Sequence, residues 1–210
     1  MNDQIRQHRI VPVAIIDDAA HAVPLAKALS AGGLPIIEVT LRTPAALEAI
    51  RAIRAECPEM LVGAGTVLTP QQVHESVAAG AMFGVSPGLN ADVVRAARDA
   101  GLFFMPGVMT PSDVEAALAL DCRLLKFFPA VPAGGLAMLQ SLAGPYAHTG
   151  VQFVPLGGVN ANNMSDYLAL PSVAAIGGSW ICDRALVREQ RWSEITALCH
   201  AAAQSISLNA

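Results

Sequence analysis

The sequence predicts an α/β fold, and within that class a single (β/α)8 TIM barrel. Short apolar runs recur eight times along the chain, and segments with helical periodicity lie between them. The composition, 53% hydrophobic and only 14% charged, is sufficient for a large core. An open doubly wound sheet is the competing topology, but no GxGxxG motif follows the first run.

The eight runs are nearly continuous in apolar residues rather than alternating, which is typical of parallel strands that are covered on both faces. They lie at residues 10–16, 34–41, 60–67, 81–87, 102–108, 123–129, 151–157 and 173–179. The repeating unit averages about 26 residues, which is short but feasible for a closed barrel. No linker or low-complexity segment divides the chain, so we expect one domain over residues 1–210.

Three of the intervening segments share a helix-start signal. Thr43, Thr69 and Thr110 each precede a proline, so each is expected to cap a helix whose first turn contains that proline. Gln72 would complete a capping box with Thr69. The segment before the first run is short and leaves little chain for a helix that closes the bottom of the barrel.

Charge and hydropathy restrict the partners. A net charge of −4, with no basic cluster beyond "RQHR" near the N-terminus, argues against nucleic acid and against an anionic membrane surface. Every apolar stretch is interrupted well before about 18 residues, so no transmembrane helix is expected. The charged fraction lies below the roughly 25% usual for soluble domains, which indicates surface hidden in an oligomer. A small-molecule partner is therefore expected.

The cellular setting follows from the N-terminus and the cysteines. The first residues lack an apolar core followed by a small-residue cleavage site, so no signal peptide is expected. The four cysteines show no CxxC spacing, which favours free thiols over disulfides or a zinc site. We expect a cytoplasmic protein.

Lys126 is the most unusual residue of the sequence. The chain has only two lysines against eleven arginines, and Lys126 lies inside the apolar run "CRLLKFFPA". Apolar surroundings disfavour the ammonium form and so favour the neutral amine that attacks a ketone to form a Schiff base. The alternative is a lysine at a strand end whose side chain reaches solvent.

Polar residues also follow other predicted strands, at the end where a barrel holds its active site. Glu38 and Thr40 lie in the second run and Arg42 lies just beyond it, so the three share one side if the strand continues. Glu38 would shuttle protons, Arg42 would hold a substrate carboxylate in a bidentate contact, and Thr66 would add a hydroxyl donor. Alternatively, Glu38 and Arg42 only pair with each other.

Glycine pairs end the last two runs, as "LGGV" and "IGGSW". Gly157, Gly158, Gly177, Gly178 and Ser179 precede expected helix N-termini, where free backbone N–H groups bind anions. In a barrel these two loops are the usual phosphate site. Tight turns, and a helix cap at Ser179, are the alternatives.

The ordered set "VTLRT", "GAGTVL", "SPG", "KFFPA", "GGV" and "IGGSW" resembles the family of 2-keto-3-deoxy-6-phosphogluconate (KDPG) and 4-hydroxy-2-oxoglutarate (KHG) aldolases over nearly the entire chain. These are class I lyases of the Entner–Doudoroff pathway. The resemblance implies a homotrimeric barrel that needs no metal or other cofactor. It implies Lys126 as the Schiff-base lysine, Glu38 as general acid/base, pyruvyl carboxylate binding by Arg42 and Thr66, apolar contacts from Pro87 and Phe128, and phosphate binding by Gly157, Gly158, Gly177, Gly178 and Ser179.

One residue departs from the family pattern. Leu156 stands in "LGG" where the family typically has a threonine, so a hydroxyl is lost beside the phosphate loop. The expected reaction is cleavage of KDPG to pyruvate and glyceraldehyde 3-phosphate, and also of KHG to pyruvate and glyoxylate. The alternatives are cleavage of the epimer 2-keto-3-deoxy-6-phosphogalactonate and a phosphosugar-binding barrel without turnover. A metal-dependent aldolase is disfavoured because no His/Asp/Glu cluster has ligand spacing.

Overall fold

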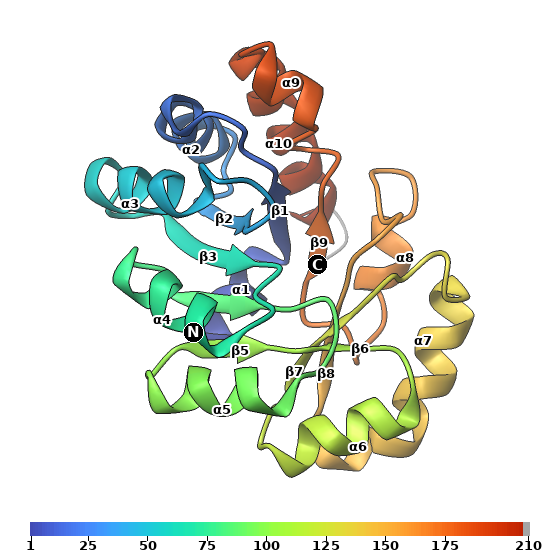
Figure 1. The fold of residues 1–210 in the computed structure, drawn as a ribbon. Coiled ribbons are helices and arrows are strands. Elements are labelled where there is room, and N and C mark those ends of the chain that lie inside the picture. Colours follow the sequence, from blue (N-terminus) through green and yellow to red (C-terminus); the bar gives the residue numbers. More distant parts are fainter. Residues whose placement is uncertain (208–210) are drawn as a thin grey trace.

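A computed structural model describes residues 1–207 and shows parallel strands at the centre with helices around them (Figure 1). Each of the eight predicted runs contains strand, although the strands are shorter than the runs. They are β1 (Ile10–Ala14), β2 (Ile36–Thr40), β3 (Leu61–Gly65), β4 (Phe83–Val85), β5 (Phe103–Met105), β6 (Gly107–Val108), β7 (Leu124–Phe127), β8 (Gln152–Pro155) and β9 (Ile176–Gly178).

The strands of residues 1–207 form two parallel sheets. One has the order β5-β4-β3-β2-β1-β9, with the first strand beside the last, and the other has the order β6-β7-β8. The run 102–108 contributes to both sheets, because Pro106 has no N–H and separates β5 from β6. On the other side a single parallel bridge, Phe153 to Val173, connects β8 to the segment before β9. The α/β class is confirmed and the parallel sheet is curled, whereas the strands of residues 1–207 do not form one continuous closed ladder.

The helices alternate with the strands along the chain and surround them in space (Figure 1). They are α1 (Asn2–His8), η1 (Ala19–His21), α2 (Ala22–Ala31), α3 (Ala46–Glu56), α4 (Pro70–Ala78), α5 (Ala91–Asp99), α6 (Pro111–Ala119), α7 (Gly135–Ala143), η2 (Gly144–Thr149), α8 (Met164–Leu168), α9 (Arg184–Arg188) and α10 (Trp192–Ser207). Contrary to expectation, the short N-terminal segment does form a helix, α1, whose Ile5 is fully buried.

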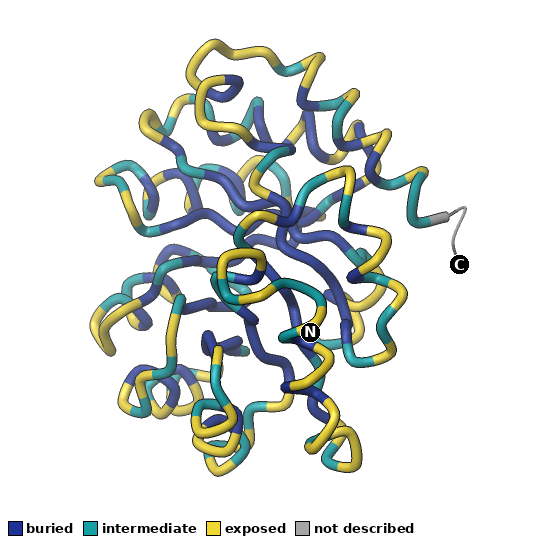
Figure 2. The backbone as a smooth tube through the Cα atoms, turned by 90° about the vertical axis from the view of Figure 1, so that its right-hand side faces the viewer, coloured by how far each residue is buried: buried dark blue, intermediate teal, exposed yellow. Residues whose placement is uncertain are grey.

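Burial explains why the strand runs are continuously apolar. Every residue of β1, β2 and β3 is buried, and the buried backbone forms the centre of the molecule in Figure 2. Phe83, Phe127 and Phe153 are the largest fully buried side chains and come from three different strands. No helix within residues 1–207 has the length and apolar character that crossing a bilayer requires.

Two of the three predicted helix starts are confirmed. The Thr69 hydroxyl accepts from the Gln72 N–H at 3.2 Å, and Thr110 accepts from the Asp113 N–H at 3.3 Å. The predicted capping box at Thr69 is shifted, because the Gln72 side chain accepts from the N–H of Leu68 rather than from that of Thr69.

The third predicted cap is wrong. Thr43 does not cap α3, which begins at Ala46 after a turn, and its hydroxyl donates instead to the carbonyl of Ile16. A threonine before a proline can cap a helix or bind a distant carbonyl. Thr43 does the second, because the carbonyl of Ile16, in the loop after β1, lies within reach of its hydroxyl.

The capping box at the start of α6 generates a prediction for stability. The Asp113 carboxylate accepts from the N–H groups of Met109 at 3.0 Å and Thr110 at 2.9 Å. Partial burial raises the pKa of this carboxyl, but the hydrogen bonds outweigh it and hold the pKa below its ordinary value. We expect Asp113→Asn to lower the free energy of unfolding at pH 7 by about 1 kcal/mol, seen as a lower Tm by circular dichroism.

The acid dependence has a definite sign. Because the folded-state pKa is the lower one, the contribution of Asp113 is complete above the unfolded pKa of about 4 and is lost as the pH falls through the folded pKa. The gap between wild type and Asp113→Asn should therefore close in acid. Asp99→Asn is the control, since that exposed carboxylate has only a 3.8 Å contact with Arg98. A gap that stays constant below pH 3 would contradict the assignment.

Candidate active site

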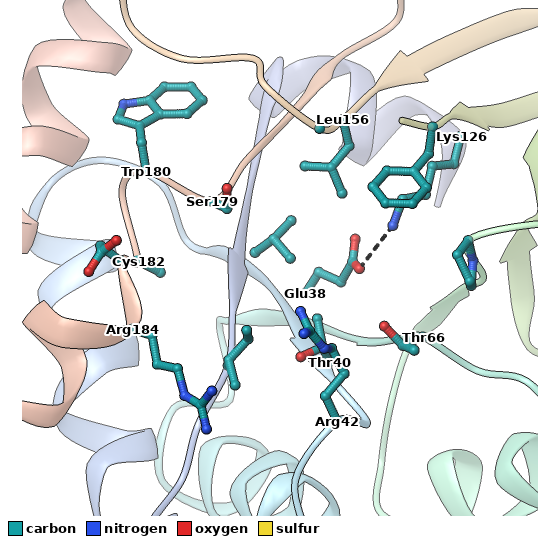
Figure 3. Close-up of a pocket in the computed structure, with 16 residues that line it drawn as sticks. Glu38, Thr40, Arg42, Thr66, Lys126, Leu156, Ser179, Trp180, Cys182 and Arg184 are labelled. Carbon is teal, nitrogen blue, oxygen red and sulfur yellow. Dashed lines mark ion pairs between the residues drawn. The ribbon is translucent and has the colours of Figure 1, made fainter. Parts of the chain in front are cut away.

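A cavity of about 520 Å³ lies at the carboxyl ends of the strands (Figure 3). Most of its lining comes from β1, β2 and β7 with the loops that follow them, and from the loops after β3, β4, β8 and β9. Of the predicted site residues, it is lined by Glu38, Arg42, Thr66, Pro87, Lys126, Phe128, Gly157 and Ser179.

Lys126 and Glu38 meet inside this cavity. Lys126 belongs to β7 and Glu38 to β2, and the Lys126 Nζ lies 3.5 Å from the Glu38 Oε1. Their side chains are only 7% and 5% exposed, so the alternative of a lysine reaching into solvent is wrong. The Nζ also lies 5.2 Å from the ring centroid of Phe128, within range of a cation–π contact.

The ion pair leaves hydrogen-bonding capacity unused. At 3.5 Å it is longer than a charged hydrogen bond, and Glu38 Oε1 has no hydrogen-bond partner although it is buried. A buried polar atom without a partner is uncommon and costly. A carboxylate in this position can take up or release a proton at an atom next to the lysine nitrogen.

Gly65 provides the space for this carboxylate. A Cβ built on Gly65 would lie 2.1 Å from Glu38 Oε1 and 2.7 Å from its Cγ. The neighbouring Gly63 likewise leaves room for the ring of Phe83, whose nearest atom would lie 2.2 Å away. The two glycines of "GAGT" are thus required by side chains from adjacent strands, which sequence reasoning did not anticipate.

Thr66 follows Gly65 with a strained backbone. Its φ is +57°, a left-handed conformation that β-branched residues rarely adopt. Such strain persists where the surroundings fix it and is common at functional sites. The strained backbone is therefore a second indication, besides the polar side chain, that Thr66 belongs to a functional site.

The alternation predicted for the second strand is confirmed, since Glu38, Thr40 and Arg42 all line the cavity. Thr40 is buried and donates to the carbonyl of Ala14 at 3.1 Å, so its hydroxyl serves the structure. Arg42 is exposed just beyond β2, and in residues 1–207 Glu38 pairs with Lys126 rather than with Arg42.

Three of the predicted glycines do not line the cavity. Gly158 is exposed, while Gly177 and Gly178 are buried in β9, where they pair with β1. A Cβ on Gly177 would lie 2.5 Å from the Leu156 side chain, so this glycine allows Leu156 to pack closely. Gly157 does line the cavity, with φ +98°.

The expected helix N-termini directly after the glycine pairs are also wrong. α8 begins only at Met164 and α9 at Arg184. Asp183, not Ser179, caps α9, because its side chain accepts from the N–H of Ala185 at 2.8 Å. Bends and turns occupy the residues between β8 and α8 and between β9 and α9.

The sequence did not single out several lining residues that follow β9. Trp180 lines the cavity together with Cys182, Asp183 and Arg184. Burial raises the pKa of the Cys182 thiol, which keeps it neutral. The only feature of the sequence that could have identified these residues as cavity lining is that they follow "IGGS" within a few positions. Among the described residues, no three His, Cys, Asp or Glu side chains gather as a metal site would require.

A buried lysine beside a carboxylate, at the carboxyl ends of the strands of an α/β fold, is the arrangement that a Schiff-base aldolase, a carbon–carbon lyase, requires. Comparison with known families agrees, because the family described as KDPG and KHG aldolase matches residues 1–198. The chain belongs to this family.

Individual relatives match over almost their whole length. The KHG/KDPG aldolase of Escherichia coli K12 is 45% identical over 95% of this chain and 92% of its own. A KDPG aldolase from Legionella pneumophila, crystallised with pyruvate captured as a covalent carbinolamine intermediate, superposes with a TM-score of 0.92 at 41% identity, covering 96% of this chain and 98% of its own. A Zymomonas mobilis KDPG aldolase with 3-phosphoglycerate gives a TM-score of 0.87 at 41% identity, covering 96% and 94%.

The packing around Glu38 generates a prediction. We expect Gly65→Ala to displace the Glu38 carboxylate and to lower the rate of pyruvate release about 100-fold, because small displacements of a reacting group are costly. Gly144→Ala is the matched control, since a Cβ there meets nothing within 4 Å. Full activity in a folded Gly65→Ala protein would show that the position of Glu38 does not matter.

Proposed function

We propose that this protein cleaves KDPG to pyruvate and glyceraldehyde 3-phosphate through a Schiff base on Lys126, and cleaves KHG to pyruvate and glyoxylate in the same way. The observation that carries the proposal is the buried Lys126 Nζ, 3.5 Å from Glu38 inside the cavity. The relatives support it, because one of them holds pyruvate as a covalent carbinolamine, the product of adding an amine to a ketone.

The chemistry proceeds on these two side chains. The neutral Lys126 amine adds to the C2 ketone, and loss of water from the carbinolamine gives a protonated imine. This imine accepts the electron pair of the C3–C4 bond as the bond breaks, while the C4 hydroxyl proton passes to Glu38 and the aldehyde leaves. Glu38 then returns a proton to C3 of the enamine, and water hydrolyses the imine to release pyruvate and the free amine.

The remaining lining residues bind the substrate. Arg42 holds the pyruvyl carboxylate by two parallel hydrogen bonds, with Thr66 as a further donor. Pro87 and Phe128 contact the apolar face of the pyruvyl group. We assign phosphate binding to Gly157 and Ser179.

The sequence also favoured Gly158, Gly177 and Gly178 for phosphate. We do not carry that role over to them, because they lie outside the lining.

We further propose a closed (β/α)8 barrel as one domain, assembled as a cytoplasmic homotrimer. The strand order with β1 beside β9, and the run 102–108 that belongs to both sheets, support closure. The low charged fraction and exposed apolar side chains in loops, among them Leu68, Met109 and Val131, support an oligomer. The four free cysteines are compatible with a reducing compartment.

Removal of the lysine tests the reaction. We expect Lys126→Ala to lower kcat for pyruvate release from KDPG by at least about 1000-fold, with an unchanged circular dichroism spectrum, because the nucleophile is gone. Lys27→Ala is the control, since Lys27 is exposed on α2 and is the other lysine of the chain. Wild-type protein that binds phosphosugar acids without releasing pyruvate would favour the non-catalytic barrel.

The epimeric substrate is a second candidate, favoured by Leu156. This residue is buried, lines the cavity beside Gly157 and offers no hydroxyl to a substrate. We expect Leu156→Thr to shift the ratio of kcat/KM for KDPG over 2-keto-3-deoxy-6-phosphogalactonate about tenfold towards KDPG, because one hydrogen bond to a substrate hydroxyl is restored. The measurement compares both proteins on both substrates, and an unchanged ratio would exclude Leu156 as the discriminating residue.

A further inference from the structure

A second arginine lies at the cavity besides Arg42. Arg184, the first residue of α9, is part of the lining, and its side chain is 52% exposed. It is clamped by Asp17, from the loop after β1, in a bidentate contact. The Arg184 Nε lies 2.9 Å from Asp17 Oδ2, and the Nη2 lies 2.5 Å from Oδ1.

The clamp fixes the direction of the guanidinium. Asp17 uses Nε and Nη2, and the Nη1 of Arg184 makes no hydrogen bond within residues 1–207. Because a guanidinium is planar, one bidentate contact sets the direction of its remaining donors. A half-exposed ion pair adds little to stability, so a stabilising role alone does not account for the arrangement.

The position of Arg184 suits the far end of the substrate. In Figure 3 it lies with Cys182, opposite Lys126 across the cavity. KDPG has its reacting ketone at C2 and its phosphate at C6, so attachment of C2 to Lys126 directs the phosphate away from the lysine. Arg42 is assigned to the carboxylate, and Asp183, the acidic residue near Arg184 in the lining, already accepts from the Ala185 N–H.

We infer that Arg184, held in position by Asp17, binds the distal phosphate of the substrate and so selects phosphorylated over unphosphorylated substrates. The inference rests on the proposed function and adds to it a specificity-determining residue and a positioning residue. Arg184 is suited to this task because its Nη1, which Asp17 leaves free, has two N–H donors that can bind phosphate oxygens.

The test compares KDPG with 2-keto-3-deoxygluconate, which has the same carbon chain without phosphate. Arg184→Ala should raise KM for KDPG about tenfold to 100-fold, change kcat by less than about threefold and leave kcat/KM for the unphosphorylated substrate unchanged. Arg184→Lys should restore part of the preference, and Asp17→Asn should fall between wild type and Arg184→Ala. Arg95→Ala is the control, because Arg95 forms an exposed ion pair with Asp92 on α5.

Two results would overturn the inference. An unchanged preference in Arg184→Ala shows that the arginine does not contact phosphate, and an equal loss on both substrates shows that the clamp with Asp17 is only structural. Thermal melts of each variant identify misfolding, and Arg184→Lys keeps the cation if Arg184→Ala does not fold. Wild-type protein that cleaves neither substrate refutes the proposed function as well, which distinguishes the two failures.

Discussion

The buried ion pair between Lys126 and Glu38 is the interaction on which the rest of the structure depends. Its two residues come from different sheets, Glu38 from the six-stranded one and Lys126 from the three-stranded one, so the pair connects the sheets across the cavity. Two buried charges are costly to desolvate, and a pair without further hydrogen bonds recovers little of that cost. The fold nevertheless accommodates it, with Gly65 leaving space for the carboxylate.

Burial separates two kinds of chemistry in the cavity. The lysine and the carboxylate are buried side by side, where a proton can pass between Glu38 and a group attached to Lys126. The two arginines, Arg42 and Arg184, are exposed and bear charges suited to anionic substrate groups. In the proposed reaction the exposed arginines would bind the anionic groups of the substrate, and the buried pair would carry out bond cleavage.

Much of the fold could be predicted because strands covered on both faces must be apolar throughout, and all eight runs contain strand. Local sequence does not show how residues far apart in the chain affect where a strand or a helix begins and ends. Pro106 divides one run between two sheets, and the carbonyl of Ile16 draws Thr43 away from its predicted cap. Closure of the barrel depends on how far each strand extends, which the apolar pattern overestimates.

The same distinction applies to the site. Lys126 and Glu38 could be identified because a charge inside an apolar strand is conspicuous, and their meeting in the cavity confirms that they share a site. Arg184 could not, because arginine near the start of a helix is common and its partner Asp17 lies 167 positions away.

The most direct test of the central claim is to incubate the protein with pyruvate and borohydride and to locate the reduced adduct by peptide mass spectrometry. The proposed chemistry predicts one adduct, on the peptide that contains Lys126, with Lys27 unmodified. Pyruvate binding without an adduct, or an adduct on Lys27 alone, would contradict it.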